Sequence, residues 1–126
     1  MILTIHDPVY SQDVLVAIGE KSESKIIRAA TRAGYSIPDA GEMAEILEMG
    51  DANGRTVGDR GTGVVIIRLR RLRRHSAEDV STLTHECVHA ATMLFDRIGF
   101  PLKAKTDEPL AYYVAFLVRS VLEKMK

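Results

Sequence analysis

The 126-residue chain has one cysteine, no tryptophan and no excess of either charge. A single cysteine, Cys87, excludes an internal disulfide and suits a reducing compartment. The 17 basic residues balance the 17 acidic ones, so the chain as a whole has no electrostatic attraction to nucleic acid. No apolar run approaches the ~18 residues that a transmembrane helix needs, and no leader segment opens the chain. We therefore expect a cytoplasmic protein that does not contact a membrane.

The length fits one domain, residues 1–126, which would bury roughly two-thirds of the surface of its unfolded chain. Periodicity and turn residues predict strands at 2–5, 14–18 and 63–70, helices at 22–33 and 38–49, and loops at 51–55 and 58–63. Two further helices follow in the C-terminal half. Strands mixed with helices in this order predict an α+β fold, in which helices cover a small mixed sheet.

A long amphipathic helix is predicted between Ser76 and Gly99. Ser76 is a favourable N-cap residue, and Gly99 is a typical residue at which a helix ends. Apolar residues recur at three- and four-residue steps between them and form one stripe: Val80, Leu83, Cys87, Ala91, Leu94 and Ile98. Because Cys87 lies on this stripe, we expect a buried thiol rather than a metal ligand.

The same helix carries His-Glu-Cys-Val-His at residues 85–89, which is an HExxH motif. Two histidines four residues apart lie about 40° from each other on a helical wheel, so both can reach one metal ion. Glu86 lies between them, where its carboxylate could take a proton from a metal-bound water. His85 and His89 project away from the apolar stripe, as ligands would. The alternative is a solvated helix face that happens to carry two histidines.

A catalytic zinc ion usually takes three protein ligands and leaves one position for water. Glu108 is the best third candidate, since it lies in the first turn of a helix predicted from about Asp107 to Met125, with Thr106 as its N-cap. His6 and His75 are alternatives. The acidic pair Asp107-Glu108 has a simpler explanation too, because negative charge is favourable at a helix N-terminus.

At this point the residues resemble a known group. His85-Glu86-Cys87-Val88-His89, followed 19 residues later by Glu108, is similar to the gluzincin pattern of zinc metallopeptidases in a minimal form. The segment Asp107-Glu108-Pro109-Leu110-Ala111-Tyr112 also resembles small proteins of tailed phages and prophages. The resemblance covers about residues 63–126, and it implies a zincin-like fold.

The resemblance implies that His85, His89 and Glu108 bind Zn²⁺ and that Glu86 is the general base. Tyr112 stands where many gluzincins have an aspartate that orients a ligand histidine, and we expect its hydroxyl to make a similar hydrogen bond. The expected activity is zinc-dependent hydrolysis of a peptide or protein substrate. The alternative is a binding or regulatory protein that keeps a zincin scaffold, with or without zinc, and lacks proteolytic activity.

Five arginines lie within residues 68–74, at the end of the strand that precedes the HExxH helix. We interpret them as the solvated end of a sheet edge. An anionic substrate or partner is a second interpretation, and a nucleic-acid patch is a third, which the lack of interleaved aromatic residues disfavours. If this strand borders the cleft, an extended peptide could add to it as another strand, and the arginines would favour acidic peptides.

Overall fold

The computed structural model describes residues 1–36, 48–59 and 61–126. Its elements run in the order β1 (Ile2–His6), β2 (Asp13–Ile18), α1 (Glu23–Arg32), β3 (Gly54–Gly58), β4 (Val65–Leu69), α3 (Ala77–Ile98), the short 3-10 helix η1 (Ala104–Thr106) and α4 (Glu108–Lys124). The helix predicted at residues 38–49 lies outside the described residues, except for its last two positions, which are not helical.

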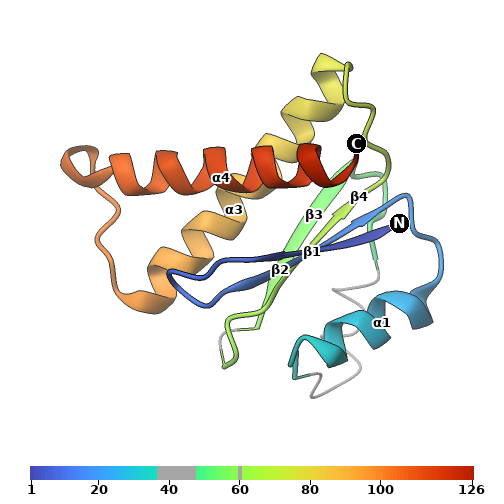
Figure 1. The fold of residues 1–126 in the computed structure, drawn as a ribbon, viewed down its shortest axis with the longest axis horizontal. Helices are drawn as coiled ribbons and strands as arrows, with labels where there is room; N and C mark the ends of the chain where they lie inside the picture. The colour runs from blue at the N-terminus through green and yellow to red at the C-terminus, as the bar shows by residue number, and fades with distance from the viewer. Residues whose placement is uncertain (37–47, 60) are drawn as a thin grey trace.

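The four strands form one mixed sheet in the order β1-β2-β4-β3. The central pair, β2 and β4, is parallel, whereas β1 and β3 each pair with their neighbour in antiparallel register. The sheet lies between helices (Figure 1). The predicted α+β class with a small mixed sheet is therefore confirmed.

Sequence patterns failed to identify β3. Residues 51–55 and 58–63 were predicted as loops, but Gly54–Gly58 pairs along its whole length with β4, with Thr56 opposite Ile67. Two of its five residues are glycines, which are unfavourable in strands. Pairing with a buried strand and packing on α3 therefore outweigh its local preference.

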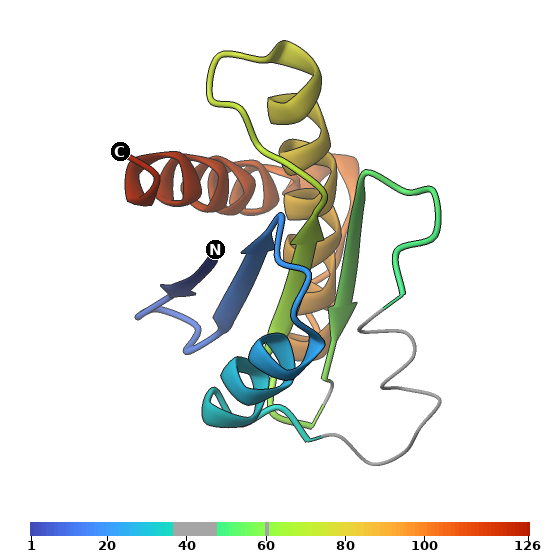
Figure 2. The same cartoon turned by 90° about the vertical axis from the view of Figure 1, so that its right-hand side faces the viewer.

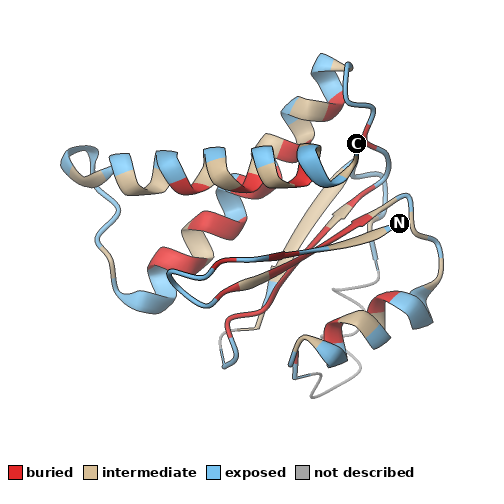
Figure 3. Cartoon of the chain, in the orientation of Figure 1, coloured by how far each residue is buried: buried red, intermediate tan, exposed pale blue. Residues whose placement is uncertain are grey.

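The two faces of the sheet have different coverings. Val14, Val16 and other residues of one face pack against α3 and α4, whereas Leu15 and Ala17 on the opposite face pack against α1. This alternation is what a strand buried on both faces requires. Figure 2 shows α1 on one side of the sheet and α3 on the other, and Figure 3 shows buried residues concentrated where the layers meet.

The helix predicted to carry the HExxH motif is confirmed as α3, and it begins and ends at the predicted residues. The Ser76 hydroxyl accepts a hydrogen bond from the Asp79 amide, and Gly99 ends α3 in the left-handed conformation with φ of 74°. On the predicted stripe Leu83, Cys87, Ala91 and Leu94 are fully buried, Val80 is half-buried, and Ile98 is exposed. The amphipathic pattern therefore gave the correct orientation of this helix.

The C-terminal helix α4 packs against α3 through a buried row formed by Tyr113, Leu117 and Val121. Its N-cap is Asp107, and not Thr106 as predicted. Thr106 ends η1, and its hydroxyl donates to the Pro101 carbonyl at 2.6 Å. None of the helices in the described part of the chain has the length and apolar character needed to span a bilayer.

Candidate metal and hydrolase site

His85 and His89 form a close pair on the exposed side of α3. Their Nε2 atoms are 3.1 Å apart, and both side chains are open to solvent. Two nitrogens at this spacing can each approach one ion at the ~2.0–2.1 Å typical of zinc-imidazole bonds. The helical spacing therefore brings the two imidazoles together, as predicted.

Glu86 lies on a different side of α3, beneath the edge strand β3. It is only 5% exposed, and its Oε1 accepts a 2.7 Å hydrogen bond from the Thr56 hydroxyl. The same hydroxyl also lies 3.3 Å from the Glu86 carbonyl oxygen. A buried carboxylate needs such a partner, so Thr56 holds the Glu86 side chain in place beneath β3.

Small residues on β3 let α3 approach the strand closely. Gly54, Thr56 and Gly58 share the face that meets the helix, because alternate strand residues point to the same side. A Cβ at Gly54 would lie 2.8 Å from Cγ of Glu86 and 3.0 Å from Cγ2 of Thr82. The space that this glycine leaves empty is where the Glu86 side chain lies.

The structure does not bring Glu108 to the histidine pair. Glu108 is exposed, and the groove between α3 and α4 is lined on the α3 side by Thr84 and Val88. His85 directly follows Thr84, and His89 directly follows Val88. Side chains of successive helix residues point in directions about 100° apart around the helix axis. The histidines therefore project about a quarter turn away from the side of α3 that meets α4.

Tyr112 is 72% exposed, and within the described residues its hydroxyl has no hydrogen bond to either histidine or to Glu108. His6 lies on β1, where its Nδ1 contacts the Asp13 carboxylate, and His75 is exposed in the loop before α3. Among residues 1–36, 48–59 and 61–126, no three His, Cys, Asp or Glu side chains are gathered closely enough to hold a metal ion.

Cys87 faces the core rather than the histidines, as predicted. Burial, together with the nearby charge of Glu86, raises the pKa of its thiol to about 12. A neutral buried thiol is a poor metal ligand, since thiolate is the binding form.

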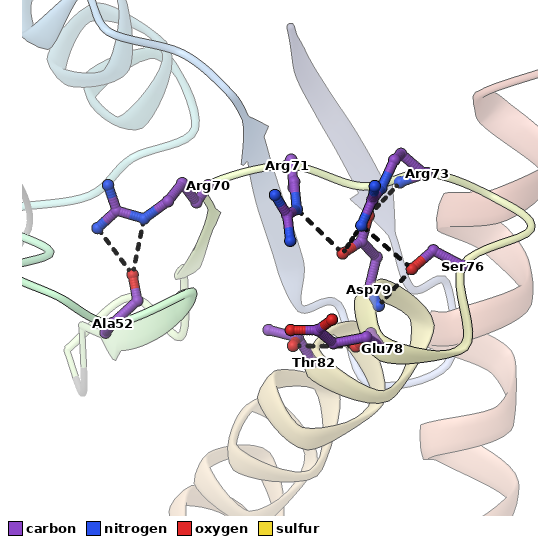
Figure 4. Close-up of polar contacts among 8 residues, drawn as sticks. All are labelled: Ala52, Arg70, Arg71, Arg73, Ser76, Glu78, Asp79 and Thr82. Atoms are coloured by element: carbon purple, nitrogen blue, oxygen red, sulfur yellow. Dashed lines mark hydrogen bonds and ion pairs between the residues drawn. The ribbon is translucent and has the colours of Figure 1, made fainter.

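The arginine run is used mainly for internal contacts. Arg70 donates to the carbonyls of Gly50 and Ala52, and Arg71 and Arg73 both bind the Asp79 carboxylate (Figure 4). Hydrogen bonding from Arg73 holds the pKa of Asp79 well below its usual range. These contacts fasten the loop after β4 to the first turn of α3.

The interpretation of this run as a sheet edge was wrong. The strand that carries it, β4, is flanked by β2 and β3 and has no free edge. The edge strand beside the HExxH helix is β3, so an added peptide strand could pair with β3 and not with β4. The basic residues lie past the end of an interior strand.

Comparison of the chain with protein-family models, curated proteins and solved structures finds no match. The sequence pattern singled out the histidines and Glu86 as candidates, but it gave no sign of Thr56 and Gly54, which position the Glu86 carboxylate. A glycine two residues before a threonine carries little signal, because its meaning depends on a helix that follows more than 20 residues later.

Proposed function

We propose that the protein is a zinc-dependent hydrolase of zincin type that cleaves peptide bonds. The observation that carries this proposal is the combination of two Nε2 atoms 3.1 Å apart with a buried, hydrogen-bonded glutamate between them in sequence. A solvated helix face would leave Glu86 in water. Burying a carboxylate has a free-energy cost, which a catalytic role would explain.

His85 and His89 are the proposed ligands. Glu108, the third ligand expected from the sequence, lies away from them, and the described residues gather no third protein ligand beside the pair. When bound, zinc would polarise the substrate carbonyl and lower the pKa of its water from ~15.7 toward ~7. Glu86 would accept a proton from that water and return it to the leaving amine. Thr56 would hold the Glu86 carboxylate in one orientation by its hydroxyl.

The edge strand β3 is the proposed place for the substrate backbone. Within the described residues β3 pairs only with β4, so its other edge can accept an extended peptide by strand addition. Thr56 lies at the middle of this strand and contacts Glu86. A peptide paired with β3 would therefore pass beside the proposed base.

A second candidate is a protein that binds peptide or metal on this scaffold without hydrolysis. It is favoured by the exposed positions of Glu108 and Tyr112, away from the histidine pair. Two histidines alone give weaker zinc binding than the three-ligand set of a catalytic site.

Metal content and peptide cleavage distinguish the two candidates. The purified wild type should hold about one zinc per chain, and His85→Ala or His89→Ala should lose it. Glu86→Gln should keep the zinc and lose hydrolysis by ~10²–10⁴-fold. Zinc binding without cleavage across a broad peptide library would support the second candidate, and full zinc occupancy in the double histidine variant would refute both metal-based proposals.

A further inference from the structure

An open apolar groove runs between α3 and α4 at the surface of the molecule. The helix α4 lies across α3 and forms one wall of the groove (Figure 1). Thr84 and Val88 line the α3 side, and Val88 is 42% exposed. Of the described residues, neither histidine of the HExxH motif lines this groove. Its role is therefore separate from that of the proposed hydrolase site.

The helix α4 has two apolar faces, and the described part of the chain covers only one of them. The covered face packs against α3 through Tyr113, Leu117 and Val121. The second face lies about 100° further round the helix and lines the groove with five apolar residues: Ala111, Val114, Ala115, Val118 and Leu122. Both alanines are exposed, and the other three side chains are only partly buried. A surface helix normally carries polar residues at such positions, so an apolar face here indicates an interaction surface.

The second face has the spacing of a seam between two helices. Ala111, Ala115, Val118 and Leu122 follow each other at steps of four, three and four residues, which is the alternation of a coiled-coil heptad. The two small residues come first along the helix and the two larger ones last. A second α4 that ran in the opposite direction would place a small residue opposite a larger one in every layer. Ala111 would lie opposite the partner's Leu122, and Ala115 opposite the partner's Val118.

The charges around the groove favour the same arrangement. The side chains that line it carry both signs, which gives no strong preference for an acidic or a basic ligand: Asp107 and Glu123 against Arg74, Arg119 and Lys126. The two signs are separated along α4, because Asp107 and Glu108 lie at its beginning and Lys126 lies just past its end. In the same antiparallel register, Glu108 would lie opposite the partner's Lys126 at both ends of the pair.

We propose that this face of α4 is the interface of a symmetric homodimer, in which two α4 helices pack in antiparallel directions. A two-fold axis brings the same surface of both copies together, which requires a face that is complementary to itself. Arg119 would lie near the partner's Tyr112, whose ring is 72% exposed in the single chain and can accept a guanidinium on its face. A helix of 17 residues is about 25 Å long. Such a contact is small, so we expect dissociation in the micromolar rather than the nanomolar range.

Sedimentation equilibrium of the whole protein tests the association. The average mass should rise with concentration from that of one chain, 13.9 kDa, toward twice that value. Ala115→Glu should raise the dissociation constant about tenfold or more, because it buries a charge opposite the partner's Val118. Ala104→Glu, at an exposed position of η1, is the matched control and should leave the constant unchanged. Melting curves at low concentration check that both variants fold.

Two results would overturn the proposal. A wild type that stays monomeric up to ~0.5 mM would show that a second copy does not cover this face. A wild type that dimerises, with Ala115→Glu dimerising equally well, would show that the interface lies elsewhere on the molecule.

Charge reversal tests the antiparallel register without adding bulk to the apolar face. Glu108→Lys would place two lysines opposite each other at each end of the dimer, and Lys126→Glu would place two glutamates there. Each variant alone should dimerise more weakly, by roughly threefold to tenfold at low salt.

An equimolar mixture of these two variants restores an opposite-charge pair at each end, so the mixture should associate about as tightly as the wild type. If the mixture is no tighter than either variant alone, the two helices do not meet in this register and the proposed dimer is refuted. None of these measurements uses peptide cleavage, so their outcome is independent of the hydrolase proposal.

Discussion

Replacing Gly54 by alanine tests whether Glu86 lies beneath β3. The added methyl would be 2.8 Å from Cγ of Glu86, 3.0 Å from Cγ2 of Thr82 and 3.1 Å from Oε2 of Glu86. The first atom is in the middle of its side chain and the second belongs to a stiff β-branched residue. Neither can move aside without shifting the carboxylate or the strand.

The expected cost follows from these contacts. Overpacking of this kind destabilises the folded protein by about 1–3 kcal/mol. Alanine also lowers the conformational entropy of the unfolded chain, which offsets about 0.4–1 kcal/mol of that cost. A net loss of about 1–2 kcal/mol corresponds to a fall in Tm of about 4–8 °C for a chain of this size. Because a base displaced by about 1 Å can lose ~10²-fold in rate, hydrolysis should fall by about 10–100-fold in Gly54→Ala.

Gly58→Ala is the matched control on the same face of β3. Its methyl would meet Sδ of Met93 at 2.9 Å, and this flexible thioether can rotate away. Thermal denaturation and peptide cleavage should therefore change less in this variant. If Gly54→Ala keeps the Tm and the cleavage rate of the wild type, or if both variants lose the same amount, the Glu86 side chain does not lie beneath Gly54.

Three further predictions concern single groups. Thr56→Val removes the donor to Glu86 and should cost about 1–3 kcal/mol in urea denaturation, with Thr62→Val as a surface comparison; an unchanged midpoint would show that the bond is unimportant. Cys87 should resist alkylation in the native protein at about pH 8 and react only after denaturation, since its pKa is raised to about 12; rapid native labelling would contradict its burial. The pKa of Asp59 is lower in the folded state, about 2, than its ordinary 3.8, so its contribution to stability is present above about pH 4 and lost as the pH falls through 2. Asp59→Asn should therefore lower Tm near pH 7 and have little effect near pH 2, and an equal effect at both would refute this.

The sequence alone determined the elements whose signals are local. The ends of α3 follow from Ser76 and Gly99, whose capping preferences act within one helical turn. Its buried face follows from the spacing of apolar residues such as Leu83 and Leu94, and the same spacing places His85 and His89 together on the opposite side. These predictions needed no knowledge of what α3 packs against.

Only the tertiary structure decided what surrounds the histidines. The strand β3 exists because β4 and α3 stabilise a glycine-containing segment that has little strand preference of its own. The position of Glu108 depends on which side of α3 packs against α4. The sequence of either helix by itself does not determine that side. The arginines likewise received their roles from distant groups, as Arg70 did from the carbonyl of Ala52. Spacing along a helix is set by its fixed geometry, whereas contacts between elements depend on the packing of the whole chain.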